Sequence, residues 1–288
     1  MDTLWQDDDP AAFGGSQRPD DEYYAGSPSD REDADAPAVD PTAFSDWNAL
    51  AADALLTYHA YTDDERARRY AERALDFLVD AVEDGAVVHY RDGDEEGERG
   101  LLADQAHVAG AFATAAQVLD GDYLDTARAV ADHAVETLQD GPAFVDGPAE
   151  GPGLLDRPLR PIDGNAAMAN ALVDLHALTG RAEYEDAARD AVGAFAGASD
   201  RLGVQVTGYA TAAARLVDAP LRIDVAAPAG SDLHRAALRV ADHEKVVVPD
   251  ADGDYEPGRA SLVVDGETSD PAATPDELSE LVESYFRA

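Results

Sequence analysis

The sequence predicts a mainly helical protein of α/α-hairpin repeats that ends in a small α/β unit. Apolar residues recur at helical spacing through successive segments between residues 41 and 219. Similar segments, each opening on an aspartate, also recur: 58 residues separate Asp46 from Asp104, and 59 separate Asp104 from Asp163. After Pro220, short β-rich runs replace the helical pattern. We therefore expect a repeat domain over 41–219 and an α/β appendix over 220–288.

Residues 1–40 precede the repeats and form an acidic segment rich in Asp, Pro, Gly and Ser. Its apolar residues show no periodicity, and such a composition is typical of disorder. We expect a disordered arm in which Trp5 and the other aromatic residues act as isolated anchors.

Pairs of helices are expected in the repeat domain, each closed by a short turn. The predicted pairs are 45–61 with 64–83, 103–119 with 123–139, and 163–178 with 182–198, followed by a single helix over 205–217. Alanine and glycine on facing surfaces allow the close approach that stacked hairpins require. This pattern predicts a solenoid or part of a closed α/α toroid, with the N-termini of the first helices around one mouth.

The third repeat shows the expected helix signals most clearly. Asp163 is a candidate N-cap, and Gly180 is the residue type that ends helices in the left-handed conformation. Met168, Leu172, Leu175 and Leu178 form the apolar stripe between them. Beyond Pro220 we expect strands at 221–227, 245–248 and 259–264, a helix at 232–242, and a closing helix from Pro275 capped by Thr274.

Composition excludes several classes of function. The chain has 60 Asp and Glu against 21 Lys and Arg, a net charge of −39, and Lys245 as its only lysine. Such a field repels nucleic acid and anionic membranes, so neither is an expected partner. The evenly spread acid suits a salt-adapted, halophilic protein in which repulsion is screened. With no cysteine, disulfides, thiol catalysis and Cys-ligated zinc are excluded.

Location and metal binding are predicted from missing signals. No apolar run approaches the ~20 residues that span a bilayer, and residues 1–9 lack the features of a secretory signal. We therefore expect a cytoplasmic protein. The sequence has no His-x-x-x-His motif and no complete calcium loop, so we expect no metal and no cofactor.

Four short motifs, in order, resemble the C-terminal α/α-toroid module of the thioredoxin-domain-containing DUF255/YyaL family, the spermatogenesis-associated protein 20 type, in a haloarchaeal form. They are Ser45-Asp-Trp-Asn-Ala-Leu50, Leu101-Leu-Ala-Asp-Gln-Ala106, Asp163-Gly-Asn-Ala166 and Ala177-Leu-Thr-Gly180 followed by Tyr184. The family's thioredoxin-like domain, first toroid helices and C-terminal cysteines have no counterpart here. What remains resembles six-hairpin glycosidase-like toroids, and this resemblance implies sugar binding at the mouth of the ring.

Candidate site residues follow from the expected mouth. Asp104 and Asp163 are the candidate acid–base pair, because two carboxyl groups at one mouth can hold different protonation states. The alternative is that both are only N-caps. The candidate substrate-binding residues are Trp47, Asn48, His89, Gln105, His107, Arg157, Arg160 and Asn165. Trp47 can stack on a sugar or, alternatively, lie between hairpins, whereas His59 and His176 fit helix ends better than a site.

Two functions remain open. The first is a carbohydrate-binding or carbohydrate-active toroid module that takes a small sugar and whose reaction is undefined. The second is a non-catalytic scaffold, or a remnant of a longer protein, that needs a partner chain or self-association at an open toroid edge.

Overall fold

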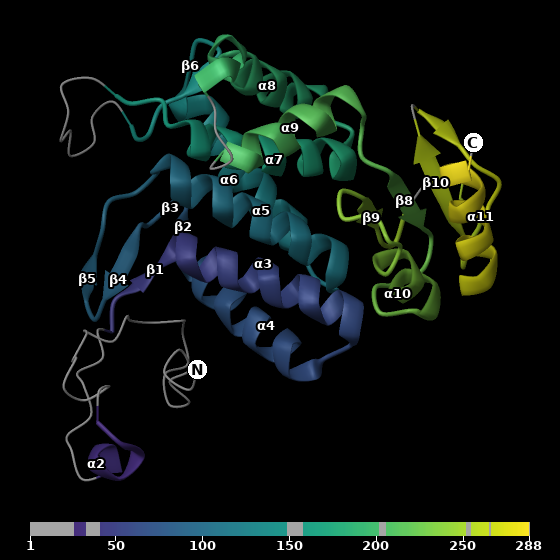
Figure 1. Ribbon diagram of the computed structural model, residues 1–288, viewed down its shortest axis with the longest axis horizontal. Coiled ribbons are helices and arrows are strands. Elements are labelled where there is room, and N and C mark those ends of the chain that lie inside the picture. Colours follow the sequence, from purple (N-terminus) through teal and green to yellow (C-terminus); the bar gives the residue numbers. More distant parts are fainter. Residues whose placement is uncertain are drawn as a thin grey trace.

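The computed structural model describes residues 26–32, 41–148, 158–201, 206–251, 255–264 and 266–287. Its fold class is the predicted one: helical hairpins side by side, followed by a small α/β unit (Figure 1). Within these residues, no helix is both long enough and apolar enough to cross a bilayer. The arm contributes only 26–32, where the short exposed helix α2 (Pro28–Glu32) was not expected.

Three helix pairs and one further helix make up the hairpin region. The pairs are α3 (Ser45–Thr62) with α4 (Glu65–Asp80), α5 (Leu102–Val118) with α6 (Tyr123–Leu138), and α7 (Ile162–Thr179) with α8 (Ala182–Gly193). Helices α3, α5, α7 and α9 (Thr207–Val217) contact one another in sequence and form an inner row. A 3₁₀ helix over Ala196–Arg201 replaces the expected end of α8.

Alanine dominates the core between the inner helices. Ala52 of α3, Ala109 and Ala113 of α5 and Ala169 of α7 are fully buried. Because a methyl group is the only side chain at these positions, neighbouring helix axes approach closely. The larger core residues Phe112, Leu56, Met168, Leu172 and Leu175 fill the remaining space.

Short strands gather at the N-terminal ends of the inner helices (Figure 1). One sheet joins β1 (Ala43–Phe44), β4 (Tyr90–Asp92) and β5 (Glu95–Glu96), and two hairpins pair β2 (Val82–Glu83) with β3 (Ala86–Val87) and β6 (Gln139–Asp140) with β7 (Ala143–Phe144). Sequence periodicity did not predict them, because strands of two or three residues are too short to show alternation. These strands hold the long loops against the helix ends.

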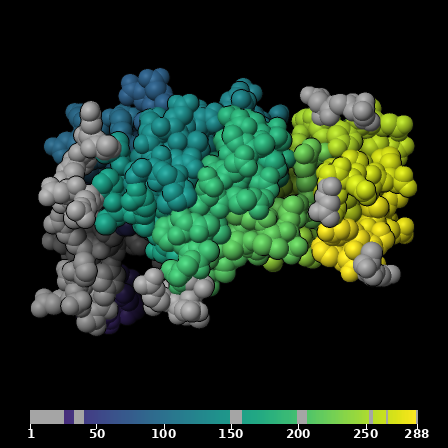
Figure 2. Space-filling view, turned by 90° about the horizontal axis from the view of Figure 1, so that it is seen from above, coloured from purple at the N-terminus to yellow at the C-terminus, as the bar shows by residue number. Residues whose placement is uncertain are grey.

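The C-terminal unit covers the opposite end of the inner row (Figures 1 and 2). Its sheet has the order β11-β10-β8-β9 and is formed by β8 (Arg222–Val225), β9 (Val246–Val248), β10 (Ala260–Val264) and β11 (Glu267–Thr268). Two helices complete it, α10 (Asp232–Leu238), shorter than expected, and α11 (Pro275–Arg287). Thr274 caps α11 as predicted, since its Oγ1 accepts from the backbone N–H of Glu277 at 3.2 Å.

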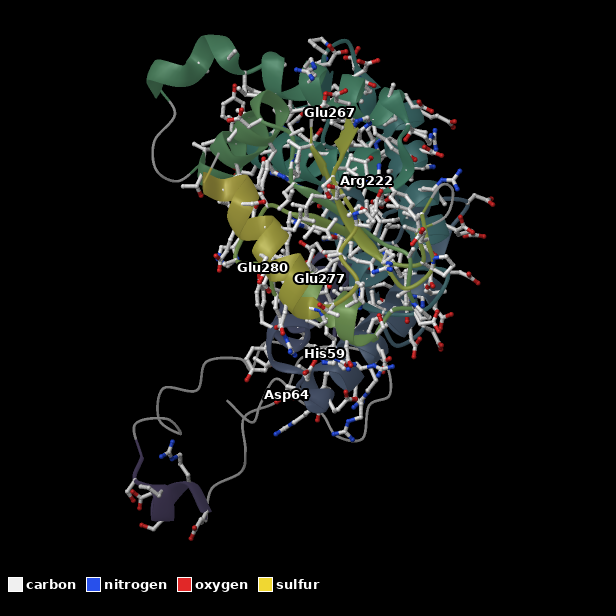
Figure 3. All side chains as sticks on the ribbon, turned by 90° about the vertical axis from the view of Figure 1, so that its right-hand side faces the viewer. His59, Asp64, Arg222, Glu267, Glu277 and Glu280 are labelled. Atoms are coloured by element: carbon white, nitrogen blue, oxygen red, sulfur yellow. The ribbon has the colours of Figure 1, made fainter. Side chains whose placement is uncertain are left out.

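Gln117 of α5 joins the C-terminal unit to the helices. Its side-chain oxygen accepts from the backbone N–H of Val247 at 3.0 Å, and its backbone oxygen lies 2.8 Å from Nε2 of His234. Seen from this end, His59 and Asp64 at the α3–α4 turn lie beside the unit (Figure 3). His59 and His176 hydrogen-bond backbone oxygens just beyond their helices, at 3.2 and 3.0 Å, which confirms the helix-end interpretation.

Helices α5 and α7 each begin one residue earlier than expected, and the aspartates of α3, α5 and α7 lie inside their helices, so the capping prediction was wrong. Phe44, Leu101 and Pro161 occupy the N-cap positions, and none of them makes a side-chain cap. Asp163 therefore lies in the first turn of α7, and Asp104 is the third residue of α5. At these positions a carboxylate is still favoured by the helix dipole. Asp46 and Asp163 are each the second residue of their helices, whereas Asp104 is the third. The start of α5 is thus shifted by one residue relative to the alignment of the three aspartates.

The fourth residue of α3, α5 and α7 carries a buried side-chain amide: Asn48, Gln105 and Asn165. Gln105 accepts from the N–H of Val87 at 2.7 Å and donates to the carbonyls of Gly85 and Val130, both at 2.9 Å. Asn165 accepts from the N–H of Phe144 at 2.8 Å and donates to its carbonyl at 2.9 Å. Asn48 donates to the carbonyl of Phe44 at 2.7 Å.

These amides satisfy backbone groups of the rim strands, so they hold the rim rather than face a ligand. The substrate-binding role expected of Asn48, Gln105 and Asn165 is therefore replaced by a structural one. Gly85 completes the arrangement at Gln105: its φ is +82°, and an added Cβ would lie 2.5 Å from the carbonyl oxygen of Ala129.

We expect Gln105→Ala to lower the free energy of unfolding by about 3 kcal/mol, because buried backbone groups at positions 85, 87 and 130 lose their partner. Chemical denaturation in molar KCl measures this. Glu136→Ala, at an exposed position on α6, is the control and should change stability by less than about 0.5 kcal/mol. Equal stability of the two variants would contradict the structural role of the amide.

Candidate functional site

Three titratable side chains from separate elements meet at the mouth of the inner row. They are Asp46 in the first turn of α3, Asp104 in the first turn of α5, and His89 in the loop before β4. One donor atom from each lies within 4.8 Å of the other two. Nδ1 of His89 is 3.0 Å from Oδ2 of Asp104, and the backbone N–H of Asp46 donates to Oδ1 of Asp104 at 3.2 Å. We call this group the mouth cluster.

The backbone of the first long loop fixes His89. Its carbonyl accepts from the N–H of Ser45 at 2.9 Å, and the preceding carbonyl of Val88 accepts from the Ser45 hydroxyl. The next residue, Tyr90, pairs with Phe44 in the β1–β4 ladder. Because the start of α3 anchors this loop, the imidazole is held against Asp104.

Burial gives Asp104 an unusual protonation state. The residue is 0% exposed. Desolvation, followed by the nearby charge of Asp46, raises the pKa of Asp104 to about 8, and the hydrogen bond from the Asp46 backbone only partly opposes this. Asp104 therefore keeps its proton at neutral pH. Because it is fully buried, it acts on a ligand only through His89 and the start of α3.

A groove runs along the inner helices towards the C-terminal unit. Its first part, the mouth-side cavity, has a volume of about 230 Å³ and is lined by residues of α3, α5 and α7, including Leu50, His107 and Asn170. Its second part, the base cavity, has about 220 Å³ and reaches Lys245 of the C-terminal unit. Asp53, Thr114 and Asp174 line both cavities, so the two are adjacent.

Two of the predicted residues lie close to the mouth cluster. His107, one turn after Asp104, lines the mouth-side cavity, and burial lowers its pKa against the opposing charge of Asp46. Trp47 is 55% exposed, with its ring centroid 4.9 Å from that of Phe44. The alternative of a tryptophan lodged between hairpins was therefore wrong.

Asp163 and Arg160 make no hydrogen bond or ion pair with the mouth cluster within the described residues. Asp163 is exposed at the start of α7, and within the described residues no hydrogen bond or ion pair joins it to Asp104. The carboxyl group beside Asp104 is that of Asp46 instead. Arg160 forms an exposed ion pair with Asp140 at the β6 hairpin. Arg157 lies outside the described residues.

Sequence reasoning missed the polar lining of the groove. Asp53, Thr114 and Asp174 each stand alone among apolar residues in their helices, and only the packing of three helices brings them together. Asp46 was recognised at the rim but was not chosen as a site residue. The mouth cluster also offers one imidazole and two carboxyl groups, a donor set that suits a divalent cation. A motif search cannot detect it, because its members come from three elements.

The raised pKa of Asp104 predicts how stability changes with pH. The folded state holds this proton more tightly than the unfolded state, so the protonated Asp104 contributes most to the free energy of unfolding below about pH 4. This contribution to stability declines as the pH rises towards about 8. We expect Asp104→Asn, which cannot ionise, to gain stability relative to the unmodified chain as pH increases from 5 to 9. Denaturation curves at several pH values measure the difference, and a constant difference would contradict the buried protonated acid.

No protein-family model and no curated protein matches the chain, but solved structures resemble part of it. A family 76 glycoside hydrolase (mannosidase) from Bacteroides thetaiotaomicron VPI-5482 is 20% identical, covers 54% of this chain and 44% of its own, and has a TM-score of 0.46. A D-mannose isomerase is 18% identical, covers 54% of this chain and 41% of its own, and has a TM-score of 0.47. The unsaturated glucuronyl hydrolase of Bacillus sp. GL1 is 23% identical, covers 56% of this chain and 49% of its own, and has a TM-score of 0.45.

The chain thus spans less than half the length of each of these three proteins. Identities and TM-scores this low describe a partial likeness in the arrangement of helices and carry no statement about activity. Membership of the DUF255/YyaL family stays a prediction from the sequence motifs.

Proposed function

We propose that the chain is a carbohydrate-binding module whose sugar site lies at the mouth of the inner helices. The observation that carries this proposal is the mouth cluster, which lies near the mouth-side cavity: His107 lines this cavity and feels the charge of Asp46. Concave sites with a few convergent polar groups and perturbed acids are where small ligands bind. Hydroxyl groups of a sugar match the carboxyl, imidazole and amide groups along this groove.

Trp47 supplies the apolar half of such a site. Its ring is more than half exposed beside Phe44, and it directly follows Asp46 in the first turn of α3. A rigid, exposed aromatic ring next to polar groups fits a ligand with one apolar and one hydroxylated face. A pyranose ring has these two faces.

The mouth cluster also has the parts for acid–base chemistry. Asp104 engages Nδ1 of His89 and leaves Nε2, on a side chain that is 33% exposed, for a ligand. A proton can pass between the buried carboxyl group and the imidazole while Nε2 donates to or accepts from a sugar hydroxyl. Asp104 is therefore a positioning residue, and His89 and Asp46 are the groups that meet the ligand.

The unpartnered side of α3 favours a second function, that of a scaffold completed by another chain. Trp47, Leu50 and Tyr58 are about half exposed (55, 48 and 53%) and, at helical spacing, share one face. Apolar side chains grouped in this way on an otherwise acidic protein mark an interaction surface. This edge fits a protein partner or a second copy of the chain.

Three further assignments are proposed from sequence patterns alone. They are membership of the DUF255/YyaL family, a cytoplasmic location, and the division into an arm over 1–40, a repeat domain over 41–219 and an appendix over 220–288.

For the sugar site, we expect Trp47→Ala to weaken sugar binding about fivefold, because a stacked aromatic ring contributes roughly 1 kcal/mol. Isothermal titration with neutral mono- and disaccharides in molar KCl measures the affinity, with and without a chelator. Tyr58→Ala, at a similarly exposed position four helical turns from the start of α3, is the matched control and should bind normally. If none of the tested sugars binds, the proposal is wrong.

The scaffold function predicts association through the exposed face of α3. Light scattering should then give a mass above the 30.4 kDa of one chain, and Tyr58→Asp should restore the monomer by placing a charge in the contact. Melting curves of both forms show whether the variant is folded. A monomer at every protein concentration, together with no partner bound through this face, would speak against this function.

A further inference from the structure

The base cavity contains the only lysine of a 288-residue chain. Nζ of Lys245 donates to the hydroxyl of Tyr61 at 3.0 Å and to the carbonyl of Asp242 at 2.9 Å, and it lies 5.0 Å from the centroid of the Tyr61 ring. An ammonium group has three donors. Two of them are used by the protein, so one is left for a ligand in the cavity that Lys245 lines.

Arg215 of α9 supplies a second donor. Its side chain is only 8% exposed and is held by an ion pair with Asp174 and by Oδ1 of Asn170 at 3.3 Å. Nε lies 3.1 Å from a carboxylate oxygen of Glu244, but the geometry is not that of a hydrogen bond. Within the described residues, this buried N–H has no acceptor. A buried donor without an acceptor is costly, so a ligand oxygen would be favoured here.

Acceptors face the same space from α3 and α7. Asp53 takes a hydrogen bond from the hydroxyl of Thr114 at 2.6 Å, and Asp174 uses one oxygen for Arg215. Burial, with a contribution from the charge of Asp174, raises the pKa of Asp53. Asp174 and Glu244 both pair with Arg215, and the cavity lining holds three carboxyl groups, those of Asp53, Asp174 and Glu244, against the two cations Arg215 and Lys245. An anionic ligand would therefore meet an excess of carboxyl groups.

We propose that the base cavity binds a neutral, polyhydroxylated molecule of monosaccharide size. Each hydroxyl group both donates and accepts, so one ligand can donate to Asp53 and Asp174 while accepting from Arg215 and Lys245. The volume of about 220 Å³ lies below the roughly 300–1,000 Å³ of drug-sized ligand pockets and suits a single sugar ring. Because the two cavities share Asp53, Thr114 and Asp174 as lining residues, this inference rests on the proposed sugar site and names the ligand class of its inner end.

Lys245 makes the test specific to this cavity. Labelling with ¹³C-lysine gives the Cε signal of one residue, without chemical modification. The probes are glucose, mannose and galactose, each paired with its uronic acid, in molar KCl. We expect at least one neutral hexose to shift the Lys245 signal saturably, and its uronic acid to bind at least tenfold more weakly. Equal or tighter binding of the uronic acids would overturn the ligand class.

A matched pair of variants tests the contacts. Thr114→Val removes a hydroxyl group that lines both cavities and should weaken the response of Lys245 about tenfold. Thr137→Val makes the same change on α6, where the hydroxyl bonds only its own helix, and should leave the response unchanged. Melting curves confirm that both variants are folded. The Thr114 hydroxyl holds Asp53, one of the proposed ligand contacts, at 2.6 Å, so an unchanged affinity in folded Thr114→Val would contradict the site.

A second reporter separates failure of the base site from failure of the proposed function. Trp5→Phe leaves Trp47 as the only tryptophan, so its fluorescence reports binding at the mouth. If a sugar changes this fluorescence saturably while the Lys245 signal stays fixed, the mouth site stands and the base site is wrong. If no sugar moves either reporter, both proposals fail. A shift of Lys245 alone would support the base site and contradict the mouth site.

Discussion

The rim of the molecule depends on one constraint, which is that backbone groups in buried loops need hydrogen-bond partners. Side-chain amides at the fourth position of α3, α5 and α7 meet this need. Gln105 alone binds the backbone at 85, 87 and 130, so it joins the first long loop to two helices. His89 reaches Asp104 because this loop is fixed. The position of the mouth cluster is thus a consequence of polar groups that never face a ligand.

Electrostatics act differently at the surface and in the groove. On the surface, the large negative charge is hydrated and screened by salt. In the groove and at the mouth, burial raises the pKa of Asp53 and of Asp104, and that of Asp104 reaches about 8. Cations are scarce in this chain, and the base cavity holds two of them, Arg215 and Lys245. An acidic protein thereby gains a pocket in which two cations face three carboxyl groups.

Two further features show how the hairpin arrangement creates surfaces. The C-terminal unit covers the C-terminal ends of the inner helices through Gln117, and its residues Lys245 and Val247 line the base cavity. At the edge of the row, α3 has no helix beyond it among the described residues, and Trp47 and Tyr58 stay exposed. The groove offers space for a small molecule, and the edge offers area for a protein.

The sequence by itself determined the helical hairpins, the α/β unit, the helix-end histidines and the stop at Gly180, because these depend on local periodicity and on residue conformation. It also placed Asp104, His89 and His107 near one mouth. Only the tertiary structure decided that Asp46, rather than Asp163, is the partner of Asp104 and that Asn165 holds a hairpin. Packing alone joined Asp53, Asp174 and Lys245 across three elements. Periodicity shows which face of a helix is buried, but it does not show a one-residue shift in the start of the helix. Such a shift in α5 changes which polar groups lie beside Asp104.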